Sequence, residues 1–211
     1  MHQENTHNAN YGDTCGELIL ASGSPRRLAI LAQHGVKARV VLPEVDESSI
    51  LAKYNNSKKP DELAKMLALA KAEDVCKRIV PGNEQLLVLA ADTIVYKEGI
   101  GILGKPDGRD AAISTLMALR NTSHQVFTGV ALIKLVSSGK NLSVQTLSDF
   151  STVFFSNYSL NDIETFLAIE PPYDKAGSYG AQGYWSRYIK RIDGDYENVI
   201  GLPWHLISGL L

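Results

Sequence analysis

The sequence predicts an α/β fold in which a mixed sheet is flanked by helices, and three observations support that prediction. The run 85–91 is apolar at nearly every position, which is typical of a strand buried on both faces of a sheet, and 17–22 also predicts a buried strand. Between them, apolar residues recur at helical spacing over 60–80. Two long β-type runs, 125–135 and 142–155, are separated by a short polar segment, which favours an antiparallel pair.

The first strand leads into a helix through a turn of small residues. Gly23 follows the strand, and Pro25 suits the first position of a helix that Gly35 is expected to end. A second strand is predicted over 36–42, and a loop rich in carboxylates over 43–49. These elements place a strand-to-helix turn near the start of the fold.

The middle of the chain brings a carboxylate to the sheet. The helix over 60–80 begins at a proline and ends before Pro81 and Gly82. The apolar run 85–91 continues directly into Asp92, so we expect this residue at the carboxyl end of a central strand. Doubly wound sheets bind their ligands at such strand ends.

The remaining elements follow from turn signals and periodicity. Residues 93–103 predict a hairpin that turns near Glu98 and Gly99, and 110–120 and 160–169 predict helices. The last segment, 171–211, alternates glycines, aromatic residues and charges, which suits either site loops or irregular packing.

Bulk composition limits the organisation and the partners. A chain of 211 residues with 45% apolar positions suffices for one core or for two small lobes around a cleft, and we expect a flexible tail over 1–16 and a single domain over 17–211. The net charge of -2 predicts no general attraction to nucleic acid polymers or anionic membranes. No run reaches the roughly 18 apolar residues of a membrane span, so a cytoplasmic protein is expected.

The turn over 22–27, with the sequence SGSPRR, has the features of an anion cradle. Small residues permit close backbone approach, and free N–H groups at a helix start favour an anion. Arg26 and Arg27 in the first helical turn oppose the helix dipole, and a bound phosphate would remove that conflict. The alternative, that both arginines only pair with surface carboxylates, stays open on these residues alone.

Triphosphate cleavage requires cations around the phosphates and a carboxylate that orients or deprotonates water. Candidates of both kinds are present, the cations being Arg26, Arg27, Lys71 and Lys105 and the acids Glu47 and Asp92. The alternative for Asp92 is a helix cap or turn residue, and lysines are more often solvated than functional. The phosphate-binding loop GxxxxGK[ST], GxGxxG after a strand, GxSxG and HExxH do not occur, and His34, His124 and His205 are interpreted as structural.

Five segments in order along the chain together resemble the Maf, or septum-formation, proteins. They are LILASGSPRR at 18–27, AADT at 90–93, LGKP at 103–106, DKAGSYGAQG at 174–183 and GDYENVIGLP at 194–203. The resemblance implies a fold similar to that of the inosine-triphosphate pyrophosphatases, with two lobes around a central cleft, and a homodimer. It further implies hydrolysis of nucleoside triphosphates to monophosphate and pyrophosphate with Mg²⁺ or Mn²⁺.

The same resemblance implies roles for individual residues. Catalytic roles fall on Asp92, Lys105 and Glu47, and the carboxylates of Asp92 and Glu47 would hold the metal. Substrate binding falls on Ser22, Arg26, Arg27, Lys71, Asp174, Lys175 and Gln182. The placements of Glu47 and Lys71 rest on short runs of sequence.

The segments ADT and YGAQG resemble the subgroup that acts on dTTP, UTP and modified pyrimidine nucleotides. The amide of Gln182 offers one donor and one acceptor, which suits the N3–H and carbonyl pattern of uracil or thymine. Tyr184 and Trp185 are larger than the residues usual in the family, so we expect them to bear on the base pocket. Two alternatives stay open: a nucleotide-sensing regulator of cell division without turnover, and a pyrophosphatase for non-canonical purine nucleotides.

Overall fold

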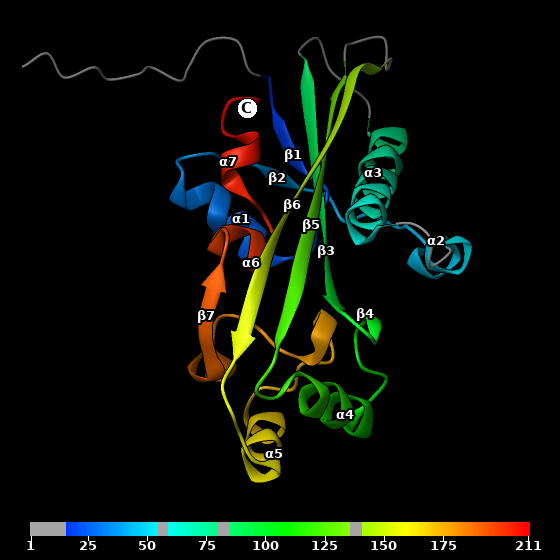
Figure 1. Cartoon of the computed structure of the whole chain (residues 1–211). Helices are drawn as coiled ribbons and strands as arrows, with labels where there is room; N and C mark the ends of the chain where they lie inside the picture. The colour runs from blue at the N-terminus through cyan, green and yellow to red at the C-terminus, as the bar shows by residue number, and fades with distance from the viewer. Residues whose placement is uncertain (1–15, 55–58, 80–84, 136–140) are drawn as a thin grey trace, which may run out of the picture.

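The computed structural model describes residues 16–54, 59–79, 85–135 and 141–211, and every structural statement below concerns these ranges. The tail expected over 1–16 lies outside them except for Gly16. Figure 1 shows a long, twisted sheet with helices on both of its sides and a second group of helices at one end. No helix in these ranges is long and apolar enough to cross a membrane.

A mixed sheet forms the centre of the fold, as the sequence predicts. Seven strands join in the order β2-β1-β3-β5-β6-β7, with β4 paired to β3. Their bounds are β1 Leu18–Leu20, β2 Arg39–Val40, β3 Leu86–Lys97, β4 Gly101–Leu103, β5 Ser123–Leu135, β6 Asn141–Phe155 and β7 Ile189–Asp193. β1 runs parallel to β2 and β3, and all other pairs are antiparallel.

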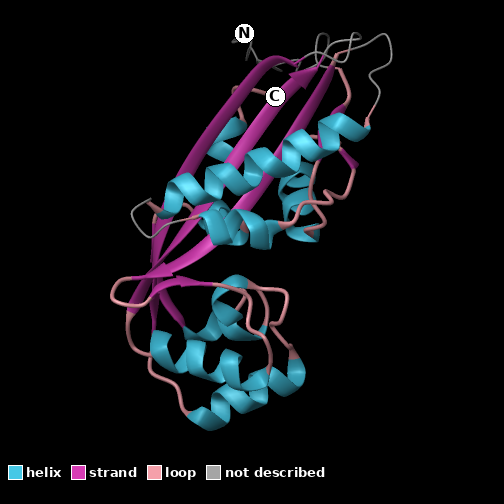
Figure 2. Cartoon of the chain, turned by 90° about the vertical axis from the view of Figure 1, so that its right-hand side faces the viewer, coloured by secondary structure: helices cyan, strands magenta, loops and turns pink. Residues whose placement is uncertain are grey.

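Helices cover the sheet in two groups. Their bounds are α1 Pro25–Gln33, α2 Glu47–Lys53, α3 Pro60–Arg78, α4 Arg109–Leu119, α5 Leu160–Ile169, α6 Tyr196–Ile200 and α7 Trp204–Ile207, with two 3₁₀ turns, η1 Ala176–Ser178 and η2 Tyr184–Tyr188. α3 packs along one face of β3 and β5, while α1, α6 and α7 lie on the other side of the sheet (Figure 1). α4 and α5 lie at the far end of the long strands (Figure 2).

The two apolar strands supply both halves of the core, because successive side chains of a strand point to opposite faces. Ile19 and Val88 pack in the cluster that includes the α3 residues Ala68 and Ala72. Leu20 and Leu89, their neighbours along the chain, belong to the larger cluster on the opposite face. Burial on both faces explains why 18–21 and 86–91 carry no polar residue.

The loop predicted over 43–49 is partly wrong, because α2 begins within it at Glu47. Asp46 caps this helix: its carboxylate accepts hydrogen bonds from the backbone N–H groups of Ser48 and Ser49. Glu47 in the first turn adds a favourable interaction with the helix dipole. An aspartate followed by a glutamate is therefore a helix start here rather than a solvated loop.

The predicted end of the central strand is also wrong. β3 continues through Asp92 to Lys97, because the longer antiparallel strand β5 pairs with it from Leu86 to Tyr96. The parallel neighbour β1 ends at Leu20, which lies opposite Leu89. Asp92 thus lies past the end of β1 rather than at the end of its own strand.

Several elements match their predicted ranges closely. α4, α5 and the hairpin from β3 to β4 are confirmed, as is the antiparallel pair β5–β6, whose connecting residues 136–140 lie outside the described ranges. Within 171–211 the structure has η1, η2, β7, α6 and α7, of which the sequence predicts none. These elements are too short for their periodicity to be read from sequence.

Candidate functional site

A cavity of about 480 Å³ opens where β1 ends and α1 begins. The first residues of α1 and the turn before it form one side, and α2, α3, β3 and the segment around η1 form the others. All predicted site residues except Gln182 line it: Ser22, Arg26, Arg27, Glu47, Lys71, Asp92, Lys105, Asp174 and Lys175. The fold thus gathers residues from distant parts of the sequence around one cavity.

Two carboxylates and one lysine form the charged centre of the cavity. The Nζ atom of Lys71 lies 2.8 Å from Oε1 of Glu47 and 2.5 Å from Oδ1 of Asp92. The side chains of Lys71 and Asp92 are only 11% and 13% exposed, whereas that of Glu47 is 37% exposed. α3 contributes the lysine, β3 the aspartate, and the first turn of α2 the glutamate.

This charged centre favours the ionised form of its glutamate. Burial raises the pKa of Glu47, but the hydrogen bond and positive charge of Lys71 outweigh burial, and Lys105 and Arg27 act in the same direction. The net pKa is therefore below its ordinary value. Glu47 and Asp92 present hard oxygen donors that converge on one cationic nitrogen, and such a donor set fits a divalent cation such as Mg²⁺.

Arg27 is held by neutral oxygens. Nη1 donates to Oγ of Ser22 at 2.9 Å, Nη2 donates to Oγ1 of Thr93 at 3.2 Å, and Nε donates to the carbonyl of Gly201 at 2.8 Å. Among the described residues it has no carboxylate within salt-bridge distance. The alternative that Arg27 pairs with a surface carboxylate is therefore wrong.

Burial lowers the pKa of Arg27, partly offset by the charge of Asp92, yet a guanidinium stays protonated in proteins. Arg26 lines the same cavity, and α1 has no acidic residue in its first turn. The start of α1 therefore carries positive charge that no carboxylate of the described residues neutralises directly, as an anion cradle requires.

The opposite wall comes from the segment before η1. The Nζ atom of Lys175 lies 2.8 Å from Oδ1 of Asp174; burial raises the pKa of this carboxyl, but Lys175 reverses the effect and lowers it overall. The N–H of Gly177 donates to the carbonyl of Gly104, which ties this segment to the loop that carries Lys105. Gly177 has a φ of +70°, and a Cβ there would lie 2.9 Å from Cγ1 of Val95, so only glycine fits.

Apolar side chains line another part of the cavity, among them Val95, Val126, Tyr179, Ala181, Val199 and Ile200. Gln182 follows Ala181 directly but is exposed and is not among the lining residues. Trp185 is fully buried and packs against Phe155 and Tyr158, so the expectation that it bears on the pocket is wrong. Its indole ring is part of an aromatic core, where burial of its large apolar surface stabilises the fold.

Apart from Ser22, the sequence did not identify the residues that hold Arg27 directly or through a neighbour. Thr93 lies beside a predicted residue, Gly201 ends α6, and Thr128 is buried on β5. The one available signal is Gly201, since a glycine often ends a short helix in the left-handed conformation. Its φ is +113°, but nothing in the sequence indicates that its carbonyl faces an arginine.

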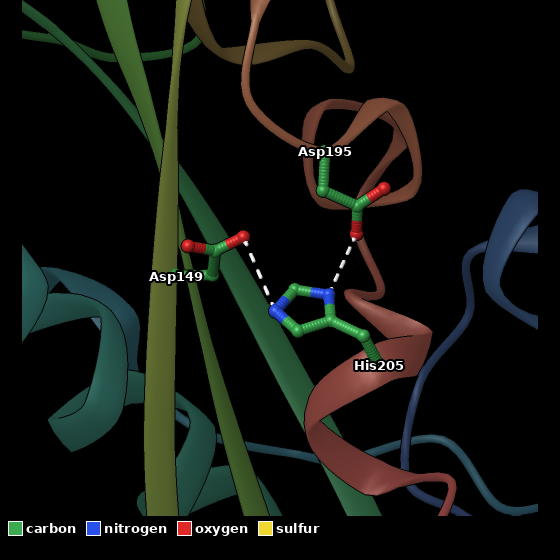
Figure 3. A group of neighbouring side chains, drawn as sticks. All are labelled: Asp149, Asp195 and His205. Atoms are coloured by element: carbon green, nitrogen blue, oxygen red, sulfur yellow. Dashed lines mark hydrogen bonds and ion pairs between the residues drawn. The ribbon is translucent and has the colours of Figure 1, made fainter.

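A second group of potential metal ligands lies outside the cavity. Figure 3 shows His205 of α7 between Asp149 of β6 and Asp195, the residue that caps α6. Nδ1 of His205 is 3.1 Å from Asp195 and Nε2 is 3.7 Å from Asp149, and the ligand atoms lie within 4.8 Å of one another. By composition and spacing this group could hold a metal ion, and none of its members lines the cavity.

His124 and His34 have contacts that agree with their interpretation as structural. His124 is buried, and its Nε2 lies 2.7 Å from the hydroxyl of Tyr179; burial lowers the pKa of His124 to about 3. His34 stacks on Trp204 and lies 2.7 Å from Glu197. Neither lines the cavity.

Comparison with known proteins identifies relatives over nearly the whole chain. Residues 17–211 match the family described as Maf-like protein. A protein of Halalkalibacterium halodurans named dTTP/UTP pyrophosphatase is 42% identical over 88% of this chain and 90% of its own. Proteins of the same name from Acetivibrio thermocellus and Caldicellulosiruptor bescii are 38% and 36% identical, over 92% of this chain and 94% and 92% of their own.

Proposed function

The chain belongs to the family of Maf-like proteins, and on this basis we propose that it is a nucleoside triphosphate pyrophosphatase acting on dTTP, UTP and modified pyrimidine nucleotides. Its products are the nucleoside monophosphate and pyrophosphate. The relatives named above support the activity and the pyrimidine preference. The observation that carries the proposal in the structure is a single cavity with cations on two walls and a carboxylate pair at its centre.

The proposed reaction uses the residues of the cavity in three roles. Water attacks the α-phosphorus, the bond from this phosphorus to the oxygen that bridges to the β-phosphorus breaks, and pyrophosphate leaves with that oxygen. Asp92 orients the water and accepts its proton, because it is a largely buried carboxylate at the charged centre. Arg26, Arg27 and Lys105 take up charge on the phosphates and on the leaving pyrophosphate.

The carboxylates of Glu47 and Asp92 would hold Mg²⁺ or Mn²⁺, and Lys71 contacts both of them and favours the ionised form of Glu47. When bound, the ion supplies positive charge that neutralises phosphate oxygens. Ser22, Lys71, Asp174 and Lys175 complete the substrate-binding set, since all of them line the cavity. Ser22 contributes through Arg27, whose Nη1 donates to its hydroxyl.

The proposed role of Gln182 is to distinguish bases at the edge of the cavity. It follows the lining residues Gly180 and Ala181, and its amide can meet a donor and an acceptor of a pyrimidine. Replacing Gln182 with alanine is expected to raise KM for UTP several-fold and to leave kcat within about twofold. Faster cleavage of ITP or XTP than of UTP by the wild type would contradict the pyrimidine preference.

Three further parts of the proposal do not concern the cavity. A single domain over 17–211, a homodimer and a cytoplasmic location stay predictions. Sedimentation of the purified chain tests the homodimer, and cell fractionation tests the location.

The deciding experiment measures pyrophosphate and orthophosphate released from dTTP, UTP, CTP, GTP and ITP, with Mg²⁺, Mn²⁺ and EDTA in parallel. We expect metal-dependent release of pyrophosphate and monophosphate, fastest from dTTP and UTP. Release of orthophosphate would assign cleavage to another bond. Nucleotide binding without turnover would favour a nucleotide-sensing regulator of cell division.

A further inference from the structure

Three hydrogen bonds fix the direction of the Arg27 guanidinium. An arginine has five N–H donors in a planar fork, and protein oxygens take three of them here, one each on Nε, Nη1 and Nη2. Among the described residues, the second N–H on each of Nη1 and Nη2 has no acceptor. These two donors can reach a phosphate oxygen only if the plane of the fork is held.

One of the three acceptors belongs to a chain of hydroxyl groups. Oγ1 of Thr93, which accepts from Nη2 of Arg27, lies 3.0 Å from Oγ1 of Thr128. Thr128 is fully buried on β5, and its hydroxyl donates to the carbonyl of Asn198 at 2.8 Å. The chain therefore runs from the cavity through two adjacent strands to α6.

The direction of the protons in this chain follows from counting them. A threonine hydroxyl carries one hydrogen, and Thr128 uses it toward Asn198. Thr93 must then donate to Thr128, which leaves the lone pairs of Thr93 for Arg27. Such chains polarise one another, so each bond strengthens the next.

The far end of the chain is rigidly held. The Asn198 side-chain amide donates to the carbonyl of Val126 on β5 and to Oγ of Ser151 on β6. The carbonyl of the same residue also accepts from the N–H of Gly201, and Gly201 supplies the acceptor for Nε of Arg27. Two of the three contacts of Arg27 thus lead back to Asn198.

We propose that Thr128 is a positioning residue for the pyrophosphatase reaction, which orients the Arg27 guanidinium toward the phosphates through the hydroxyl of Thr93. The proposal rests on the proposed function, since it assumes that Arg27 binds phosphate. Thr128 itself is not a lining residue of the cavity, so its effect must pass through its neighbours. A substitution there changes the aim of Arg27 without removing its charge.

The test compares Thr128→Val with a matched control, Tyr158→Phe. Both remove one buried hydroxyl that donates to a backbone carbonyl, for Tyr158 the carbonyl of Leu116 at 2.6 Å. Thr128→Val is expected to lower kcat/KM for UTP roughly tenfold, as the weakening of one hydrogen bond to a charged group would. Tyr158→Phe is expected to change kcat/KM less than about twofold, and Thr128→Ser to restore most of the activity.

A double-variant cycle separates positioning from a general loss of structure. If Thr128 acts through Arg27, then Thr128→Val has no further effect on kcat/KM once Arg27 is alanine. Additive effects, or equal losses in Thr128→Val and Tyr158→Phe, would overturn the proposal. If Thr128→Val does not fold, Thr93→Val breaks the same chain at a half-buried residue, and the same cycle decides.

The result also separates this proposal from the proposed function. A wild type that releases no pyrophosphate refutes the function. A wild type that turns over and loses activity in Arg27→Ala, but not in Thr128→Val or Thr93→Val, keeps the function and refutes the positioning role.

Discussion

Two groups in this molecule have the same plan, a nitrogen-bearing side chain between two carboxylates, and they differ in everything around it. Lys71 lies between Glu47 and Asp92 with only 11% of its side chain exposed, on the wall of a cavity. His205 lies between Asp149 and Asp195 with 52% of its side chain exposed, outside that cavity (Figure 3).

The difference shows that surroundings, rather than the set of residues, decide what such a group can do. Asp195 accepts from two backbone N–H groups as the cap of α6, so its carboxylate already has a structural role. Asp92 lies on a strand that needs no cap, and its carboxylate contacts Lys71 in a cavity that Arg26, Arg27 and Lys105 also line.

The largest expected effect comes from Asp92→Asn. If this carboxylate orients and deprotonates water, the amide should lower kcat for pyrophosphate release by about 10³-fold, within the usual range of general base catalysis. The matched variant Asp149→Asn removes a carboxylate of the other group and is expected to change kcat less than about twofold. Near-wild-type turnover in Asp92→Asn would refute the role assigned to Asp92.

Removal of Lys71 from between Glu47 and Asp92 should have the next largest effect, and this effect is on the free energy of unfolding. Lys71→Met leaves Glu47 and Asp92 close together without a cation, and loss of one partner from a largely buried ion pair costs about 3 kcal/mol. The control is Lys65→Met on the same helix, whose partly exposed pair with Asp61 contributes about 0.5 kcal/mol. Urea unfolding without metal measures both, and equal stability of the two variants would contradict the comparison.

The sequence predicts the buried strands, α3, and the turn before α1, because these features depend on local periodicity and on residues adjacent in the chain. It places Asp92 correctly next to a buried strand, but it ends that strand too early, because pairing with β5 extends β3 to Lys97. The hydrogen bond between the hydroxyls of Thr93 and Thr128 cannot be predicted from the sequence, because 35 residues separate them and only the register of β3 and β5 aligns them. The resemblance names Glu47 and Lys71, whereas their contact with Asp92 is visible only in the fold.

A smaller effect is expected in the pH dependence of stability. Because Lys71 holds the pKa of Glu47 below its ordinary value of 4.5, ionised Glu47 contributes stability that is present above this value. That contribution is lost as the pH falls through the lower pKa of the folded protein. Glu47→Gln should therefore flatten the pH dependence of the free energy of unfolding below pH 4.5, relative to the wild type.

The cause of this flattening can be tested in a second background. In Lys71→Met the ammonium that lowers the pKa of Glu47 is gone, so Glu47→Gln should no longer flatten the curve. Urea titrations at several pH values measure all four proteins. The same flattening with and without Lys71 would mean that another group sets the pKa of Glu47.

The smallest effect is expected at the group formed by His205, Asp149 and Asp195, which is called the exposed group below because 52% of the His205 side chain is exposed. His205→Ala removes the side chain between Asp149 and Asp195 but leaves the cap of α6 intact, and exposed ion pairs contribute less than about 1 kcal/mol. Pyrophosphate release should stay within about twofold of the wild type, and stabilisation of the fold by Mn²⁺ should be unchanged. If His205→Ala instead abolished that stabilisation while Glu47→Gln kept it, the metal would bind at the exposed group. The carboxylate pair of the cavity would then act on substrate through charge and proton transfer alone.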